Sequence, residues 1–235
     1  MRKFWGLVAA VAGAWSACAD AEEVFSRGWR FSRVEAPEAR FAAVAFDDSK
    51  WAEVEVPHDW AIAGPFGGES KDGATGQLPW KGVGVYRRTF ELSERDLQGC
   101  VLLDFDGVMT RPQVYVNGRL AGGWDYGYMS FRVDATKFAK PGPNQLTVVA
   151  DTRAHRSRWY PGAGLTHKVV LKTRPKAHFV HNGIFVTTPV VEPKRAVVKV
   201  AWEVENADEE ATVEVSVGAA REGAGATARR VRASA

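Results

Sequence analysis

The sequence predicts an all-β protein built as an antiparallel β-sandwich. Short segments of alternating or continuously apolar residues recur along the chain, and turn-forming residues separate them. No long stretch has the 3.6-residue period of an amphipathic helix. With 235 residues, of which 46% are hydrophobic and 25% charged, the chain can form one large domain or two modest ones.

The expected strands are separated by two well-defined turns. Asn117-Gly118 supplies the two positive-φ residues that a type I′ hairpin needs, between strands at 114–116 and 119–121. Lys140-Pro141-Gly142-Pro143-Asn144 predicts a second turn. Further strands are expected at 84–92, 101–105, 130–133, 145–150 and 168–172.

Residues 63–82 have a different composition, rich in glycine and polar residues, and predict a long loop. Loops of this length are usually functional or disordered, and composition alone does not separate the two readings. Just before this loop, His58-Asp59 stands between Pro57 and Trp60, which favours a local hydrogen-bond clamp over half of a catalytic triad.

The first residues have the pattern of a secretory signal peptide, assigned to residues 1–21. Arg2 and Lys3 precede an apolar segment at 4–15, which is too short to span a bilayer, and small residues follow it. An exported protein, periplasmic or extracellular, is therefore expected, with no membrane span. A lipoprotein acylated at Cys18 is the alternative. Cys100 then remains as the single thiol, a buried small hydrophobe.

Charge and histidine spacing exclude several classes of function. The net charge is +3, without a Lys/Arg stripe, so no nucleic-acid partner is expected. The histidines lack the spacing of a metal-coordinating cluster, so neither a metal nor a cofactor is expected. These histidines are His155, His167, His178 and His181.

One segment combines an arginine with two aromatic rings before a tight turn. Ser157, Arg158, Trp159 and Tyr160 precede Pro161-Gly162-Ala163-Gly164. Aromatic rings stack on the C–H faces of sugars, and a guanidinium donates to hydroxyls or a carboxylate. These four residues are the candidate substrate-binding site. The alternative interpretation places the two rings in the core and Arg158 at its solvated rim.

Six further segments, together with residues 157–164, resemble glycoside hydrolase family 2, and most closely its bacterial β-galactosidase branch. The resemblance extends over residues 25 to 217. The segments are Val56-Pro57-His58-Asp59-Trp60, Gly84–Phe90, Leu103–Val108, Val114–Gly118, Tyr126–Phe131 and Gly183–Pro189.

The resemblance implies a division into domains. Residues 22–175 correspond to a jelly-roll, galactose-binding-like domain, and the loop at 63–82 then reaches toward a sugar. Residues 176–235 correspond to the start of an immunoglobulin-like β-sandwich, truncated because such a domain needs about 100 residues. Within it, alternation at 197–205 places Val198, Val200, Trp202 and Val204 on one strand face, whereas residues 218–235 lack alternation.

The resemblance also implies what the chain does and lacks. Retaining glycosidases use two carboxyl groups, which in the family are glutamates on a TIM barrel, one of them in an Asn-Glu dipeptide. This chain has no Asn-Glu dipeptide and no room for a barrel of about 250 residues. The expectation is an inactive N-terminal fragment of a β-galactosidase-like hydrolase that supports and rims the sugar site, with no catalytic residue of its own.

Alternatives remain open for partners and specificity. A β-glucuronidase or β-mannosidase fragment, or a stand-alone carbohydrate-binding sandwich, fits the same residues. The expected partners are a carbohydrate, the missing barrel and, in a homo-oligomer, further copies. The chain departs from the family at Arg158, where several branches carry aspartate, and at Gly164-Leu165-Thr166-His167, where Gly-Ile-Tyr-Arg is usual.

The aspartates of the chain receive structural roles. Asp104 and Asp106 share one strand face because side chains alternate, and we expect them to serve as polar edge or turn residues. Asp134 precedes Ala135-Thr136 and is expected to cap a turn.

Overall fold

The computed structural model of the protein describes seven parts of the chain. They are residues 6–13, 21–63, 81–154, 162–193, 195–206, 212–221 and 224–234. The chain divides into two compact units, Cys18–Arg174 and Pro175–Ala235, the second of which includes Met1–Ala17.

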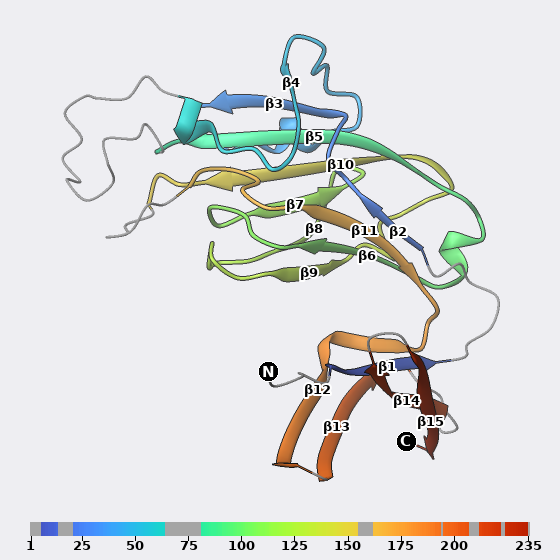
Figure 1. Ribbon diagram of the computed structural model, residues 1–235. Coiled ribbons are helices and arrows are strands. Elements are labelled where there is room, and N and C mark those ends of the chain that lie inside the picture. Colours follow the sequence, from blue (N-terminus) through green and yellow to red (C-terminus); the bar gives the residue numbers. More distant parts are fainter. Residues whose placement is uncertain are drawn as a thin grey trace. The chain divides into compact units, whose positions relative to one another are not determined.

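The unit Cys18–Arg174 consists of a six-stranded and a four-stranded sheet, and every strand pair in both is antiparallel (Figure 1). The prediction of an antiparallel β-sandwich is thereby confirmed. In spatial order the larger sheet contains β4 (Ala52–Val54), β3 (Trp29–Val34), β5 (Val83–Leu92), β10 (Gly142–Asp151), β7 (Gln113–Val116) and β8 (Arg119–Gly123). The smaller contains β2 (Ala21–Val24), β11 (Val169–Arg174), β6 (Cys100–Phe105) and β9 (Phe131–Asp134).

The main core of this unit comes from the facing surfaces of the two sheets. Tyr86 and Val148 of the larger sheet and Leu103 of the smaller are fully buried there. Trp29 is also buried, and its indole nitrogen donates a 2.8 Å hydrogen bond to the carbonyl of Phe25, so burying the ring leaves no unpaired donor.

A second, smaller core covers the outer face of the larger sheet. Phe41, from the 3₁₀ helix η1 (Ala39–Ala42), packs there with Val83, Val85 and Val149, and Phe46 and Trp51 lie against them. Arg87 on the same face is 1% exposed, and its Nε lies 2.6 Å from the carboxylate of Asp48. Residues 83–87 of β5 are therefore buried on both faces of the sheet.

The turns agree with the sequence in one case and differ in the other. Asn117 and Gly118 have φ of 51° and 81°, as a type I′ hairpin between β7 and β8 requires. The predicted turn at 140–144 is shorter than expected, because β10 already begins at Gly142. There Gly142–Asn144 pair with Phe90–Leu92, and the Asn144 side chain bonds to the backbone of Lys140.

The other unit is also built from antiparallel strands. β12 (His178–Glu192) pairs with β13 (Arg195–Glu205), while β1 (Gly6–Gly13), β14 (Thr212–Arg221) and β15 (Ala224–Ser234) form a three-stranded sheet. Val198, Val200, Trp202 and Val204 are half-buried and alternate with exposed residues, which confirms their shared face. Residues 224–234, which lack sequence alternation, nevertheless form a strand, because pairing uses backbone groups.

Candidate functional site

The four candidate sugar-binding residues, Ser157, Arg158, Trp159 and Tyr160, lie outside the described residues, as does most of the predicted loop at 63–82. The backbone on either side of both segments is described. It belongs to one end of the sandwich in Cys18–Arg174, and its hydrogen bonds define the surroundings of the site.

His58, Asp59 and Trp60 bind the backbone that follows the candidate segment. The backbone N–H of His58 donates to Leu165 at 2.7 Å, and that of Trp60 donates to Ala163 at 3.0 Å. Asp59 Oδ1 accepts hydrogen bonds of 2.9 Å from the backbone N–H groups of both Ala61 and Ala163. The predicted hydrogen-bond clamp is thus present, but it is not local as expected, because the contact of Asp59 with Ala163 spans 104 residues of sequence.

Glycine is required at two positions where the backbone packs closely against Asp59 and Tyr86. Gly164 has φ of +112°, and a Cβ at this position would lie 2.1 Å from the hydroxyl of Tyr86. At Gly162 a Cβ would lie 2.7 Å from Asp59 Oδ2. Gly164 also exchanges backbone hydrogen bonds with Met109, so three chain segments meet at this point. The Pro-Gly-Ala-Gly run is therefore explained by close packing of backbone against side chains.

The backbone before the candidate segment is anchored in a similar way. The N–H of Asp151 donates to Thr110 at 2.9 Å, and that of Thr152 donates to Gly82 at 2.9 Å. The N–H of Gly82 donates in return to Thr152 Oγ1 at 2.8 Å. Gly82 is the last residue of the predicted loop, and Trp60 lies shortly before its start. The predicted loop and the candidate segment are therefore joined at both ends. Trp60, before the loop, bonds to Ala163, after the segment, and Gly82, at the end of the loop, bonds to Thr152, before the segment.

A hydrogen-bonded pair of the half-buried His58 and the buried Tyr86 lies next to the clamp. His58 Nδ1 is 2.8 Å from the hydroxyl of Tyr86, and the Phe31 ring packs 4.7 Å from both rings. Burial lowers the pKa of His58 and raises that of Tyr86 far above its usual value. Both groups are neutral at physiological pH, which suits a structural hydrogen-bonded pair.

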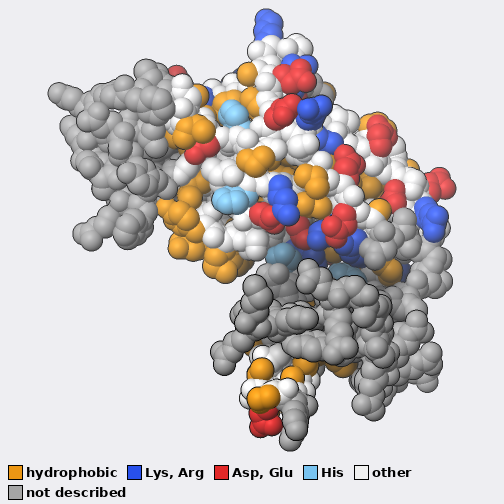
Figure 2. Space-filling view, viewed as in Figure 1, with side chains coloured by type: hydrophobic (Ala, Val, Ile, Leu, Met, Phe, Trp, Pro, Cys, Tyr) orange, Lys and Arg blue, Asp and Glu red, His pale blue; other side chains and the backbone are white. Residues whose placement is uncertain are grey.

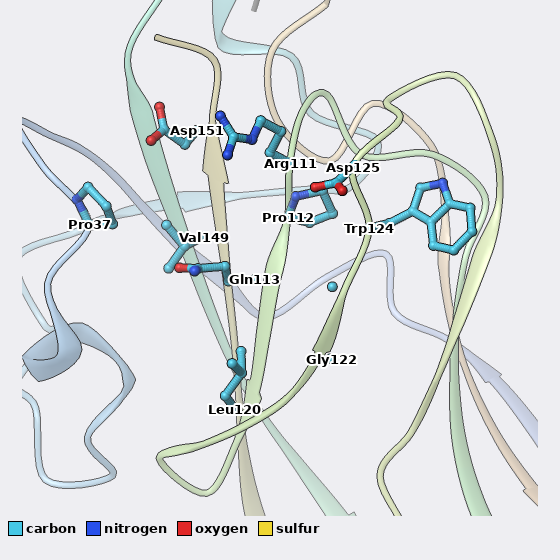
Figure 3. Close-up of a pocket in the computed structure, with 11 residues that line it drawn as sticks. Pro37, Arg111, Pro112, Gln113, Leu120, Gly122, Trp124, Asp125, Val149 and Asp151 are labelled. Atoms are coloured by element: carbon cyan, nitrogen blue, oxygen red, sulfur yellow. The ribbon is translucent and has the colours of Figure 1, made fainter. Parts of the chain in front are cut away.

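A hollow of about 520 Å³ lies beside these anchors, on the outer face of the larger sheet (Figure 3). Its lining includes the polar side chains of Arg111, Gln113, Asp125 and Asp151 and the apolar side chains of Leu120 and Val149. The Arg111 side chain points toward Asp151, whereas the ring of Trp124 is turned away from the hollow (Figure 3).

One carboxylate of the hollow is already well satisfied. Asp151 accepts hydrogen bonds from the Arg153 guanidinium at 3.0 and 2.7 Å and from the Arg153 backbone at 3.0 Å. These hydrogen bonds hold the pKa of Asp151 below its usual value, and the nearby charge of Arg111 lowers it further.

Exposed aromatic side chains occupy the neighbouring loop between β8 and β9. Trp124, Tyr126 and Tyr128 are exposed, and one face of the Trp124 ring stacks on Phe131. Figure 2 shows hydrophobic side chains gathered at this end of the sandwich. Such rings offer apolar surface of the kind that sugars bind.

The structure corrects the expected role of Asp104. This residue is 5% exposed, on a strand that lies between β11 and β9, so it is not at a sheet edge. Arg132 donates to its two carboxylate oxygens at 2.6 and 2.9 Å, and Lys172 Nζ lies 3.3 Å away. Asp106 instead is exposed beside Lys168. Asp134 caps a turn as predicted, by accepting from the N–H of Thr136.

Three further properties concern the described residues. No group of three or more His, Cys, Asp or Glu side chains in the described part of the chain is arranged to hold a metal ion. Within the same residues, no helix has the length and apolar character to cross a membrane. Cys100 is buried, as expected of a small hydrophobic residue.

Comparison with known proteins agrees with this architecture. Residues 65–180 match the family described as glycosyl hydrolase 2 galactose-binding domain-like. The chain is 37% identical over 179 residues to the β-galactosidase BoGH2A of Bacteroides ovatus, a match that covers 75% of this chain and 21% of the relative. The chain belongs to glycoside hydrolase family 2.

Two other members extend the comparison. A β-glucuronidase of Formosa agariphila is 25% identical over 207 residues, which cover 77% of this chain and 21% of that protein. The crystal structure of a family 2 member from Bacteroides cellulosilyticus superposes with a TM-score of 0.67 at 29% identity, covering 84% of this chain and 24% of the other. The chain thus spans about a fifth of the length of the curated family 2 relatives it matches.

Proposed function

We propose that the chain is the amino-terminal, saccharide-contacting part of an exported, retaining family 2 glycoside hydrolase that acts on β-galactosides. In this proposal residues 1–21 are a signal peptide, 22–175 the jelly-roll domain and 176–235 the beginning of an immunoglobulin-like domain. Ser157, Arg158, Trp159 and Tyr160 contact the sugar, and a barrel outside this chain supplies the catalytic carboxylates.

The observation that carries the proposal is the clamp at the end of the sandwich. Asp59 and the neighbouring backbone join the residues flanking the candidate segment to those flanking the loop at 63–82. Two segments that are far apart in sequence therefore leave the same end of the sandwich. This arrangement supports a shared role in contacting one ligand.

A β-glucuronidase is the second candidate, because a relative with that name aligns with 77% of the chain. The two candidates differ in the charge of the sugar. A glucuronide carries a carboxylate that the guanidinium of Arg158 would bind in a charge-assisted pair, whereas a galactoside offers hydroxyl groups only.

Binding by the full chain tests the proposal. Methyl β-D-galactopyranoside is titrated into the ¹⁵N-labelled protein, and the chemical-shift changes are compared with those caused by methyl β-D-glucuronide. We expect saturable galactoside binding that Trp159→Ala weakens, since a stacked sugar loses its aromatic platform. Stronger glucuronide binding that requires Arg158 would favour the second candidate, and absence of binding by either glycoside would refute the sugar-contacting role.

Hydrolysis provides an independent measurement. The purified chain is expected to release no nitrophenol from p-nitrophenyl β-D-galactopyranoside above the uncatalysed rate, because the proposal places both catalytic carboxylates in the barrel. Replacing the matching segment of the Bacteroides ovatus β-galactosidase with this chain is expected to retain turnover. Turnover by the isolated chain would contradict the division of roles.

A further inference from the structure

We propose that the hollow beside Arg111 is a second saccharide subsite, which binds one neutral pyranose ring through Arg111, Gln113 and Asp125. It extends the proposed function, because it assumes that the parent protein binds glycans. The subsite consists of described residues only, none of which belongs to the candidate segment at 157–160.

The size and chemistry of the hollow fit a single sugar ring. Its volume of about 520 Å³ lies within the range of small-molecule sites. Leu120 and Val149 provide apolar contacts for C–H groups, while Arg111, Gln113 and Asp125 provide polar groups for hydroxyls (Figure 3). A sugar presents both kinds of surface at once, which a purely apolar or purely ionic ligand does not.

The polar groups of this subsite have unused bonding capacity. Neither the Arg111 guanidinium nor the Asp125 carboxylate forms a hydrogen bond or an ion pair with another residue that the structure describes. Gln113 uses its side-chain oxygen to accept a 3.2 Å hydrogen bond from Tyr115. The Gln113 amide N–H groups, the Arg111 fork and the Asp125 carboxylate can therefore donate to and accept from sugar hydroxyls.

The backbone gives the subsite its shape. Arg111 has φ of 49°, a left-handed conformation that is uncommon for a residue with a side chain and is found preferentially at functional positions. Gly123 lines the hollow, and a Cβ there would lie 2.4 Å from the carbonyl oxygen of Pro112. The backbones of Gly123 and Pro112 therefore approach each other closely at the hollow, and only glycine allows this approach.

The charges select an uncharged ligand. A sugar carboxylate near Arg111 would also approach Asp125 and Asp151. The Arg153 guanidinium neutralises Asp151 but not Asp125. Asp125 would remain as a repelling charge in the same hollow. Hydroxyl groups suit the donor Arg111 and the acceptor Asp125 together, since a hydroxyl can both donate and accept.

The test uses the full chain and measures binding of methyl β-D-galactopyranoside by ¹⁵N chemical-shift titration. Arg111→Gln keeps a linear side chain but removes the charged fork, and Asp125→Asn removes the charge of the acceptor. Each is expected to raise the Kd by about tenfold, the effect of losing one charge-assisted hydrogen bond. Arg27→Gln and Asp106→Asn are matched controls on exposed residues outside the hollow, and neither is expected to change the Kd.

The outcomes distinguish this subsite from the proposed function. Shifts of the Gln113 side-chain amide that disappear in Arg111→Gln, but persist in Trp159→Ala, establish the subsite even if residues 157–160 contact no sugar. If Trp159→Ala abolishes binding and neither Arg111→Gln nor Asp125→Asn changes the Kd, the subsite is overturned and the proposed function is retained. Absence of galactoside binding, or equal binding of methyl β-D-glucuronide at the hollow, also overturns it.

Discussion

Asp59 Oδ1 accepts a 2.9 Å hydrogen bond from the backbone N–H of Ala163 and a second one from Ala61. One half-buried carboxylate thereby satisfies two backbone donors from distant parts of the sequence. Together with the main-chain hydrogen bonds of His58 and Trp60, this contact joins the segments around the candidate site.

Removing that carboxylate should destabilise the sandwich. Asp59→Ala leaves the Ala61 and Ala163 N–H groups without their acceptor, and we expect the free energy of unfolding to fall by about 2 kcal/mol. Urea denaturation followed by far-ultraviolet circular dichroism measures the change. Asp106→Ala is the control, and an equal loss in both variants would show that the clamp contributes nothing of its own.

Gly164 should tolerate alanine poorly. Gly164→Ala places a Cβ against the hydroxyl of Tyr86 and forces alanine into φ of +112°, so we expect a loss of about 3 kcal/mol. Gly142→Ala, with φ of +78° and no atom within 4 Å of the added Cβ, should cost only about 1 kcal/mol. Thermal denaturation of both variants separates contact from backbone conformation.

The same contact predicts a compensating change. Tyr86→Phe removes the hydroxyl that approaches the added methyl group, so Gly164→Ala combined with Tyr86→Phe should be more stable than Gly164→Ala alone. In the wild-type background Tyr86→Phe should instead be destabilising, because His58 loses its partner at 2.8 Å. Additive losses in the double variant would disprove the steric explanation.

Asp104 should make the protein sensitive to acid. Burial by itself raises the pKa of this carboxyl, but the hydrogen bonds and charge of Arg132, with help from Lys172, outweigh it and lower the pKa below the unfolded value. Its contribution to stability is therefore complete above the unfolded pKa and is lost as pH falls through the lower, folded pKa.

Substitution of Asp104 tests this pH dependence. Asp104→Asn should cost about 2 kcal/mol near pH 7, where the paired carboxylate is charged, and much less near pH 2, where both proteins lack that charge. The measurement is the free energy of unfolding by urea across this pH range. A difference between variant and wild type that stays constant with pH would contradict the assignment.

Arg87 should be needed to hold residues 35–51 on the larger sheet. Arg87→Met removes the contact with Asp48 at 2.6 Å and that with Thr147 at 3.2 Å, and leaves Asp48 without its buried partner. We expect a loss of about 3 kcal/mol and faster cleavage by trypsin within that segment. Arg27→Met removes a pair whose side chains are 81% and 70% exposed, and should change neither measurement.

The features that sequence predicted depend on local chemistry. Asn117-Gly118 identifies its own turn, and His58-Asp59 between Pro57 and Trp60 indicates a clamp, although not its distant partner. The role of Asp104 was misjudged, because its strand position depends on β11 and β9, which are remote in sequence. The hollow itself could not be predicted, since only the folded sheet brings Arg111 and Asp125 together, and no spacing signals a left-handed arginine.

The anchors around the candidate segment consist mainly of main-chain atoms, at His58, Trp60, Gly82, Thr152 and Leu165. Main-chain hydrogen bonds persist whichever side chains are attached to neighbouring positions. If the proposed function is correct, mutations between the anchors alter sugar preference with little penalty to the sandwich. This independence offers a physical route by which one scaffold could serve enzymes that cleave different glycosides.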